Sequence, residues 1–202
     1  MIKCFLFDLG NVLFPFDIAK TIRYLRENCP RLGPDTLVTL KNLLEQYELG
    51  KMSSIAFFEA VKKETAYKGS FEVFQRQFSE IFTENPDAIS TALLLKKSYP
   101  VYILSNTNEM HLEYIRKTFP FFTRFRGVFS YEAGAAKPDP QIFQIAIDRF
   151  SIEPKNTLFI DDKYENILAA KNLGFLTIHY ILENGKPGFK LQDELTKFNI
   201  SL

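Results

Sequence analysis

Three acidic side chains that follow apolar runs carry most of the chemical information in this sequence. Asp8 comes directly after a short apolar run near the N-terminus and just before Gly10, while Asp161 and Asp162 follow a second apolar run. Each run reads as a buried strand, and in open α/β sheets ligands bind at the carboxyl ends of the strands. Carboxylates that meet at such an edge repel one another and need a cation between them. The sequence therefore predicts a site for a hard metal ion and phosphate.

Polar side chains also follow two other predicted strands. Ser105 and Asn106 follow one of them, and Lys137 lies in the loop after the other. An aspartate such as Asp8 can attack phosphorus to give an acyl phosphate. A serine hydroxyl and the backbone amides at a helix N-terminus bind phosphate oxygens. A lysine neutralises the nucleophile and the phosphate together, and Mg²⁺ held by the carboxylates would complete the site.

Short strands that alternate with helices are expected to position these groups. The predicted strands cover residues 3–7, 101–104, 127–130, 157–160 and 175–178. Strands separated by helices of this length predict an α/β fold with a doubly wound parallel sheet. Parallel strands end at the same edge, so the four sets of polar groups should meet there. The last 20 residues are expected to form a surface excursion and a terminal helix.

Residues 17–85 follow a different pattern, with four consecutive helical stripes and no strand between them. We predict a helical cap over 17–85, inserted into an α/β catalytic core made of residues 1–16 and 86–202. Such a lid would exclude water during phosphoryl transfer. We expect the turn at 47–51 to carry substrate specificity and the phenylalanines between 71 and 82 to form the core of the cap.

Composition argues against several classes of protein. The chain has 25 Lys and Arg against 24 Asp and Glu, so no general attraction to nucleic acid or acidic membranes is expected. No apolar stretch approaches the roughly 20 residues that span a bilayer, and the early strand leaves no room for a signal peptide. Cys4 and Cys29 are expected to be reduced thiols. We expect a cytoplasmic monomer or homodimer without nucleic-acid or membrane partners.

The order of four motifs resembles the haloacid dehalogenase-like (HAD) hydrolase superfamily, and most closely its phosphatase branch with a helical cap. The motifs are Phe-Asp-Leu-Gly-Asn-Val, Leu-Ser-Asn-Thr-Asn, Lys-Pro-Asp-Pro and Phe-Ile-Asp-Asp, and together they cover essentially the whole chain. The resemblance implies a Rossmann-like core, phosphatase activity and Mg²⁺ as the cofactor.

The resemblance also implies roles for individual residues. Asp8 would be the nucleophile, and Lys137 would act with it in catalysis. Substrate phosphate would be bound by Ser105 and Lys137, with Asn106 either a further ligand or a turn former. The implied metal ligands are Asp8, the carbonyl of Gly10, Asp162 and, directly or through an outer contact, Asp161.

Gly10 departs from the family pattern, which usually has a second aspartate two residues after the nucleophile. That aspartate protonates the leaving group and later activates water, and general acid–base catalysis contributes roughly 10²–10⁴-fold. Two explanations follow. Either the leaving group needs little protonation, as with an anomeric or aryl oxygen, or another residue supplies the proton. The candidates are Asn11, Asp17 and Glu48.

Several polar residues also have structural alternatives. Ser105 could be the N-cap of the helix predicted over 109–118, and Asp161 with Asp162 could cap the helix that begins near 164. Asn166 could brace the metal ligands or face solvent. His111 and His179 lack the spacing of a metal site or a triad, so structural roles are expected.

The expected function is that of a Mg²⁺-dependent phosphatase for a small phosphorylated metabolite, with sugar phosphates as the first class and nucleotides as the second. The main alternative is a non-catalytic phosphate-binding or interaction protein on the same fold, and Gly10 motivates it. A signalling receiver domain is disfavoured because its acidic pair follows the first strand. Dehalogenation of 2-haloacids is disfavoured because that reaction needs no metal.

Overall fold

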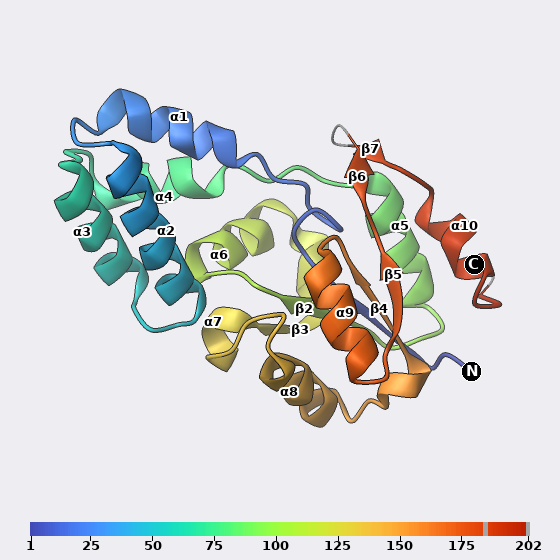
Figure 1. The fold of residues 1–202 in the computed structure, drawn as a ribbon. Helices are drawn as coiled ribbons and strands as arrows, with labels where there is room; N and C mark the ends of the chain where they lie inside the picture. Colours follow the sequence, from blue (N-terminus) through green and yellow to red (C-terminus); the bar gives the residue numbers. More distant parts are fainter. Residues whose placement is uncertain (184–185, 201–202) are drawn as a thin grey trace.

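The core of the molecule is a five-stranded parallel sheet, described by a computed structural model that covers residues 1–183 and 186–200. The spatial order of the strands is β3-β2-β1-β4-β5, so the chain winds outward in both directions from β1 (Figure 1). The strands are β1 (Cys4–Phe7), β2 (Val101–Ser105), β3 (Arg126–Phe129), β4 (Thr157–Asp161) and β5 (Leu176–His179). All four pairings are parallel. The predicted doubly wound α/β fold is confirmed.

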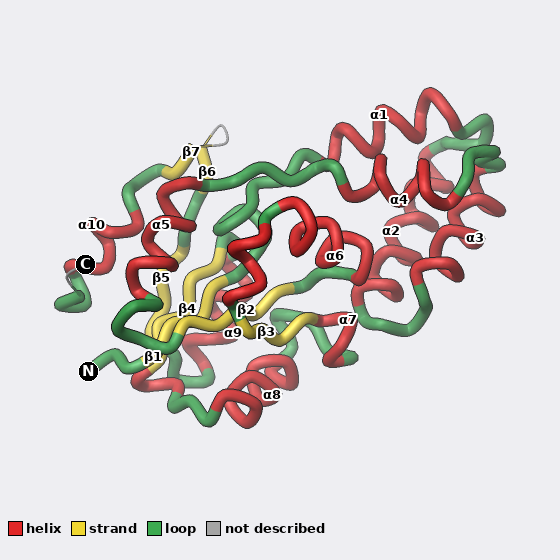
Figure 2. The backbone as a smooth tube through the Cα atoms, turned by 180° about the vertical axis from the view of Figure 1, so that it is seen from behind, coloured by secondary structure: helices red, strands yellow, loops and turns green. Residues whose placement is uncertain are grey.

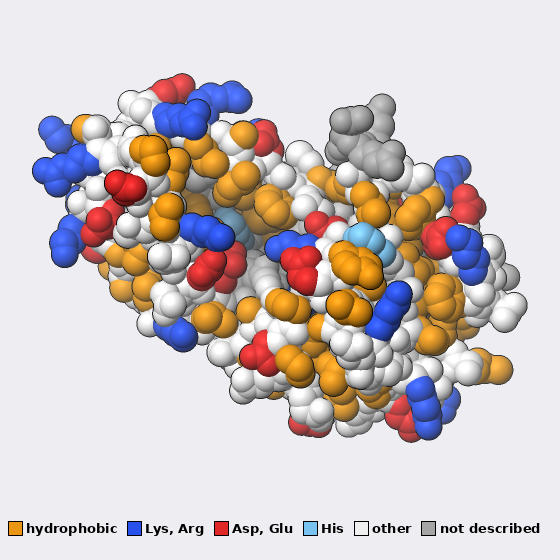
Figure 3. Space-filling model, viewed as in Figure 1, with side chains coloured by type: hydrophobic (Ala, Val, Ile, Leu, Met, Phe, Trp, Pro, Cys, Tyr) orange, Lys and Arg blue, Asp and Glu red, His pale blue; other side chains and the backbone are white. Residues whose placement is uncertain are grey.

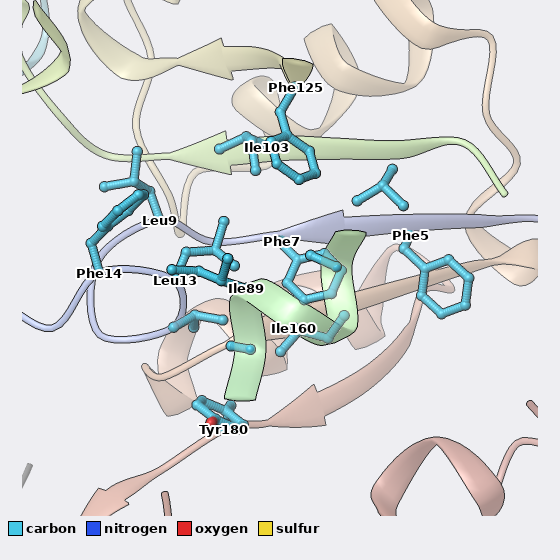
Figure 4. Packing of buried hydrophobic residues seen from close by; sticks show 14 of the residues in the cluster. Phe5, Phe7, Leu9, Leu13, Phe14, Ile89, Ile103, Phe125, Ile160 and Tyr180 are labelled. Atoms are coloured by element: carbon cyan, nitrogen blue, oxygen red, sulfur yellow. The ribbon is translucent and has the colours of Figure 1, made fainter. Parts of the chain in front are cut away.

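Helices cover both faces of this sheet because the strands are apolar on both faces. One face packs against α5 (Pro86–Leu95), α6 (Glu109–Thr118), the 3₁₀ turn η1 (Pro120–Arg124) and α10 (Leu191–Thr196). Figure 4 shows Phe5, Phe7 and Ile160 on this side, with Ile89 of α5 beside them. The opposite face packs against α8 (Pro140–Phe150) and α9 (Tyr164–Asn172).

Four further helices form a bundle with an apolar core of its own. They are α1 (Ile18–Asn28), α2 (Pro34–Glu48), α3 (Ser54–Thr65) and α4 (Phe71–Ser79). Figures 1 and 2 show this bundle set to one side of the sheet, reached by the chain between β1 and α5. Phe74 and Phe78 are buried in its core, as predicted, whereas Phe82 belongs to the core around the sheet.

Short elements account for most differences from the predicted pattern. Ser130 begins the one-turn helix α7 (Ser130–Ala133) instead of ending β3. A 3₁₀ turn, η2 (Pro154–Asn156), precedes β4, and the strands β6 (Leu182–Glu183) and β7 (Lys186–Pro187) pair as a hairpin. Segments this short have no periodicity that a sequence pattern can reveal.

The expected terminal helix is present as α10, and it is part of the core. Leu191 and Leu195 are fully buried, and the backbone N–H of Leu191 donates to the Asp87 carboxylate of α5 at 2.9 Å. Across the described residues, no helix combines the length and apolar character needed to cross a membrane.

Candidate active site

Adjacent central strands bring the three acidic side chains together. β1 pairs with β4, and the Asp8 N–H extends this ladder by donating to Ile160 O at 2.8 Å. Asp161 ends β4 and Asp162 follows it. One carboxylate oxygen of each of the three residues lies within 4.8 Å of the others. The expected convergence of these groups at one sheet edge is therefore what the structure shows.

Lys137 lies between two of these carboxylates. Its Nζ is 2.7 Å from Asp8 Oδ1 and 2.6 Å from Asp161 Oδ2, and it also donates to Leu104 O at 2.7 Å. An ammonium group has three donor hydrogens; Lys137 makes hydrogen bonds to Asp161 and Leu104 O, and its contact with Asp8 is an ion pair. Burial would lower the pKa of Lys137, but the charges of Asp161 and Asp8 outweigh it and hold that pKa above its ordinary value.

Asp161 is completely buried and both of its oxygens are engaged. Oδ2 contacts Lys137, while Oδ1 accepts from the Lys163 N–H at 2.8 Å and from Asn166 Nδ2 at 2.9 Å. Asn166 is buried as well, so of its two alternatives the structure supports bracing. With these contacts Asp161 can orient Lys137. They fit that role at least as well as direct binding of a metal ion.

The cluster has three carboxylates and one lysine, so a cation could still balance its negative charge. Burial raises the pKa of Asp8, Lys137 lowers it and the charges of Asp161 and Asp162 raise it; together they bring it to about 7. Burial likewise raises the pKa of Asp162. Although Asp8 Oδ1 is in ion-pair contact with Lys137, it accepts no hydrogen bond of acceptable geometry. Oxygen ligands with unbalanced negative charge fit a hard divalent ion.

Two amides hold the cluster in place, and sequence reasoning gave neither this role. Asn11 has φ 55° and its Nδ2 donates to Asp162 Oδ2 at 3.0 Å. Asn106 makes a reciprocal pair with the backbone of Lys137, donating to Lys137 O at 2.7 Å and accepting from Lys137 N at 2.8 Å. Sequence offered one hint for both roles: each asparagine lies in a loop that follows a predicted strand, close to a residue already proposed for the site.

Ser105 is the last residue of β2 and is buried beside the cluster. Its hydroxyl makes only a long contact, 3.4 Å, to Asn106 O. The alternative role as a helix N-cap is wrong, because Asn108 caps α6 by accepting from the His111 N–H at 3.0 Å. Binding of phosphate by Ser105 and Asn106 stays a prediction.

The helical bundle contacts the core beside this site. Tyr47 of α2 is buried, and its hydroxyl accepts from the Met110 N–H at 3.1 Å, in the first turn of α6. Gly50 has φ 67° and lies so close to Tyr131 O that a Cβ would be 2.0 Å from it. Next to these contacts, burial raises the pKa of Glu48 to about 7, against the opposing charge of Lys163. A specificity role for the 47–51 turn stays a prediction.

Asp17, another candidate proton donor, makes a structural contact. Asp17 is the N-cap of α1 and accepts from the Ala19 N–H at 3.0 Å.

The contacts of the two histidines fit the structural roles expected for them. Burial lowers the pKa of His111 to about 4, and its ring stacks on Phe78 at 4.4 Å. One ring nitrogen of His179 lies 2.9 Å from Asp162 O.

Comparison with known proteins agrees with the family that the motifs and the site geometry indicate. Residues 2–174 match the family model described as haloacid dehalogenase-like hydrolase. The chain is 31% identical to a D-ribitol-5-phosphate phosphatase from Bacteroides thetaiotaomicron, covering 92% of this chain and 94% of that protein. It is 27% identical to a sesquiterpene phosphatase from Aspergillus oryzae, covering 88% and 89% of the two chains.

Solved structures give the same result. A HAD family enzyme from Bacteroides thetaiotaomicron, crystallised with magnesium and inorganic phosphate, superposes with a TM-score of 0.85 at 27% identity and covers 96% of this chain and 99% of that one. The family model, the fold and the order of the site residues agree. The chain belongs to the haloacid dehalogenase-like hydrolase family.

Proposed function

We propose that the protein is a Mg²⁺-dependent phosphatase that hydrolyses a small phosphorylated metabolite through an aspartyl-phosphate at Asp8. The observation that carries this proposal is the grouping of Asp8, Asp161 and Asp162 within 4.8 Å, with Lys137 contacting the first two. A lone buried carboxylate would be a structural liability, whereas three carboxylates and a lysine at a strand edge form the parts of a phosphoryl-transfer site.

The reaction has two displacements on phosphorus. In the first, a carboxylate oxygen of Asp8 forms a bond to phosphorus while the bond to the ester oxygen breaks, and the departing oxygen takes a proton. In the second, water attacks phosphorus, the bond to Asp8 breaks, and inorganic phosphate leaves; the attacking water releases a proton that balances the one taken up by the departing oxygen in the first displacement. Lys137 holds Asp8 in position and neutralises charge on the transferred group. Ser105 would donate its hydroxyl to a phosphate oxygen.

The donor set fits the metal that the proposal requires. Asp8, Asp162 and the carbonyl of Gly10 would hold Mg²⁺, with Asp161 as a direct ligand or an outer partner. When bound, the ion offsets the negative charge that nucleophile and phosphate bring together. Asn11 fixes the orientation of Asp162 for this purpose, because its amide holds one oxygen of that carboxylate.

Residues 17–85 would act as the cap over this site. Tyr47 and Gly50 support that proposal because they join α2 to the core beside α6 and α7. The named relatives act on a polyol phosphate and on a sesquiterpene phosphate, so likeness alone leaves the substrate class open. Sugar phosphates and nucleotides remain the first classes to assay, alongside esters of apolar alcohols.

The test is phosphate release from a panel of metabolites with Mg²⁺ or with EDTA, for the wild-type protein and Asp8→Asn. The matched control is Asp148→Asn, an exposed carboxylate on α8. We expect turnover only with Mg²⁺, its loss in Asp8→Asn and its retention in the control. Phosphate binding without hydrolysis across the whole panel would instead favour the non-catalytic alternative that Gly10 motivates.

A further inference from the structure

The loop after Asp8 places an aromatic ring beside the reacting centre. Gly10 forms a bridge with Phe14, and the Asn11 N–H donates to Phe14 O at 3.0 Å, so the chain folds back on itself. As a result the ring of Phe16 covers Gly10. A Cβ built on Gly10 would lie 3.0 Å from Cε1 and 3.5 Å from Cδ1 of Phe16. The ring thus occupies the space that a side chain at position 10 would need, two residues from the proposed nucleophile.

Phe16 is only partly covered by the protein. Its other contacts include Phe82, with which it forms a backbone bridge and a ring contact of 5.9 Å between centroids. Even so, 40% of its surface is exposed. A single exposed apolar residue needs no explanation. Here, however, the exposed ring lies over the loop that follows Asp8, and Ile18, two residues further along the chain, is exposed as well.

An apolar cavity of about 270 Å³ lies among the four helices of the bundle. Ile18, two residues after Phe16 and itself exposed, lines it together with side chains such as Leu25, Leu40, Leu44, Phe74 and Phe78. Of the described residues that line the cavity, Lys41 alone is charged. Figure 3 shows hydrophobic side chains gathered over α1 and α2 and reaching the hollow between the bundle and the sheet region.

An unbroken series of ring contacts joins the cavity to Phe16. Phe78 lines the cavity and stacks on His111 at 4.4 Å, His111 meets Phe82 edge-on at 5.1 Å, and Phe82 contacts Phe16. His111 adds no charge to this packing, because burial lowers its pKa to about 4. Phe78, His111 and Phe82 are buried, so they support Phe16 from inside the protein. The residues that face solvent here are Phe16 and Ile18, with the α1 N-cap Asp17 between them. The apolar lining of the cavity beside Ile18 offers few partners for the hydroxyl groups of a sugar or polyol.

We propose that Phe16 is a specificity-determining residue whose ring packs against apolar carbon of the group esterified to phosphate. The bundle cavity would receive the distal part of that group. On this basis the enzyme prefers phosphate monoesters of apolar alcohols to those of polyhydroxy compounds. The inference rests on the proposed phosphatase function and selects one substrate class for it.

Chain length gives the test a quantitative scale. Each methylene buried contributes about 0.8 kcal/mol, which corresponds to roughly a fourfold gain in kcat/KM. We would measure kcat/KM for n-alkyl phosphates of increasing length, a pentitol phosphate, a hexose phosphate and p-nitrophenyl phosphate. For the wild-type protein we expect kcat/KM to rise by up to about fourfold per methylene until the cavity is full, and to exceed that for the polyol esters.

Two variants and one control test the assignment. Phe16→Ala should lower kcat/KM for the longer alkyl esters at least tenfold, while inhibition by inorganic phosphate, which makes no contact with an alkyl-binding wall, stays unchanged. Ile18→Glu places a charge at the rim of the cavity and should flatten the dependence on chain length. Val38→Ala, an exposed apolar residue outside the cavity, should change neither quantity.

The outcomes separate this inference from the function it rests on. Mg²⁺-dependent turnover with no preference for longer alkyl chains, or an unchanged preference in Phe16→Ala, would overturn the role of Phe16 and leave the phosphatase proposal standing. Absence of phosphate release from every ester, the aryl ester included, would overturn the phosphatase proposal and the specificity inference with it.

Discussion

Replacing Lys137 with methionine removes the ammonium group that lies between Asp8 and Asp161. Methionine has a similar length and no charge, so the change leaves the volume of the site nearly unaltered. Two buried carboxylates then face each other without their shared cation, and Leu104 O loses the donor that now lies 2.7 Å away. The substitution therefore isolates the electrostatic contribution of the lysine.

The magnitude follows from the burial of all three partners. The side chains of Lys137 and Asp161 are about 1% and 0% exposed, and that of Asp8 about 9%. Removing one partner of a buried ion pair costs about 3–5 kcal/mol, because the other charge is left uncompensated. Asp8 can take up a proton, since its pKa is about 7, and this relieves part of the cost. We expect a loss of about 3 kcal/mol at pH 7.5, which lowers Tm by roughly 6–12 °C for a chain of this size.

The assay is urea and thermal unfolding in EDTA, so that no divalent ion replaces the missing charge. Lys155→Met is the matched control, because Lys155 makes an exposed ion pair with Glu153 at 3.7 Å and such pairs contribute about 0–1 kcal/mol. If Lys137→Met unfolds within about 1 kcal/mol of this control, the lysine does not stabilise the cluster as described.

Two other predictions concern the contacts that support the site. Gly50 and Gly134 both have φ near 68°, but only at Gly50 would a new Cβ collide with Tyr131 O. We expect Gly134→Ala to lower the free energy of unfolding by roughly 1 kcal/mol. Gly50→Ala should lower it by at least twice as much. Equal losses in thermal unfolding would contradict the tight approach of α2 to α7. Between pH 6.5 and 4, His111 binds a proton in the unfolded chain but not in the folded protein, where it is buried. The free energy of unfolding should therefore fall by up to about 3 kcal/mol as the pH is lowered through this range, and then level off. His111→Gln should lack this slope in urea unfolding; an unchanged slope would place its origin elsewhere.

The parts of the site that could be predicted from sequence are those fixed by strand direction. Asp8 and Asp161 each follow a short apolar strand, and parallel strands end at one edge, so their convergence needed no knowledge of side-chain contacts. Lys137 could be placed at the same edge on the same reasoning. The longer helices were predictable because each carries an apolar stripe long enough to show its period.

Contacts between side chains far apart in sequence could not be predicted in this way. Asn11 holds Asp162, 151 residues away, and Asn106 clamps the backbone of Lys137. Either asparagine would satisfy its hydrogen bonds equally well within its own turn, so sequence gives no means of choosing. The position of Phe16 over Gly10 likewise depends on how the loop after β1 folds back, which no apolar pattern encodes.

The most direct test of the account is to identify the atom that receives phosphate during turnover. Wild-type protein would be mixed with Mg²⁺ and substrate, quenched in acid within the steady state, digested and analysed by mass spectrometry. We predict a hydroxylamine-labile phosphate on the peptide that contains Asp8, formed only with Mg²⁺ and missing from Asp8→Asn. Phosphate carried by another residue, or full turnover in Asp8→Asn, would contradict the assignment of Asp8 as the nucleophile.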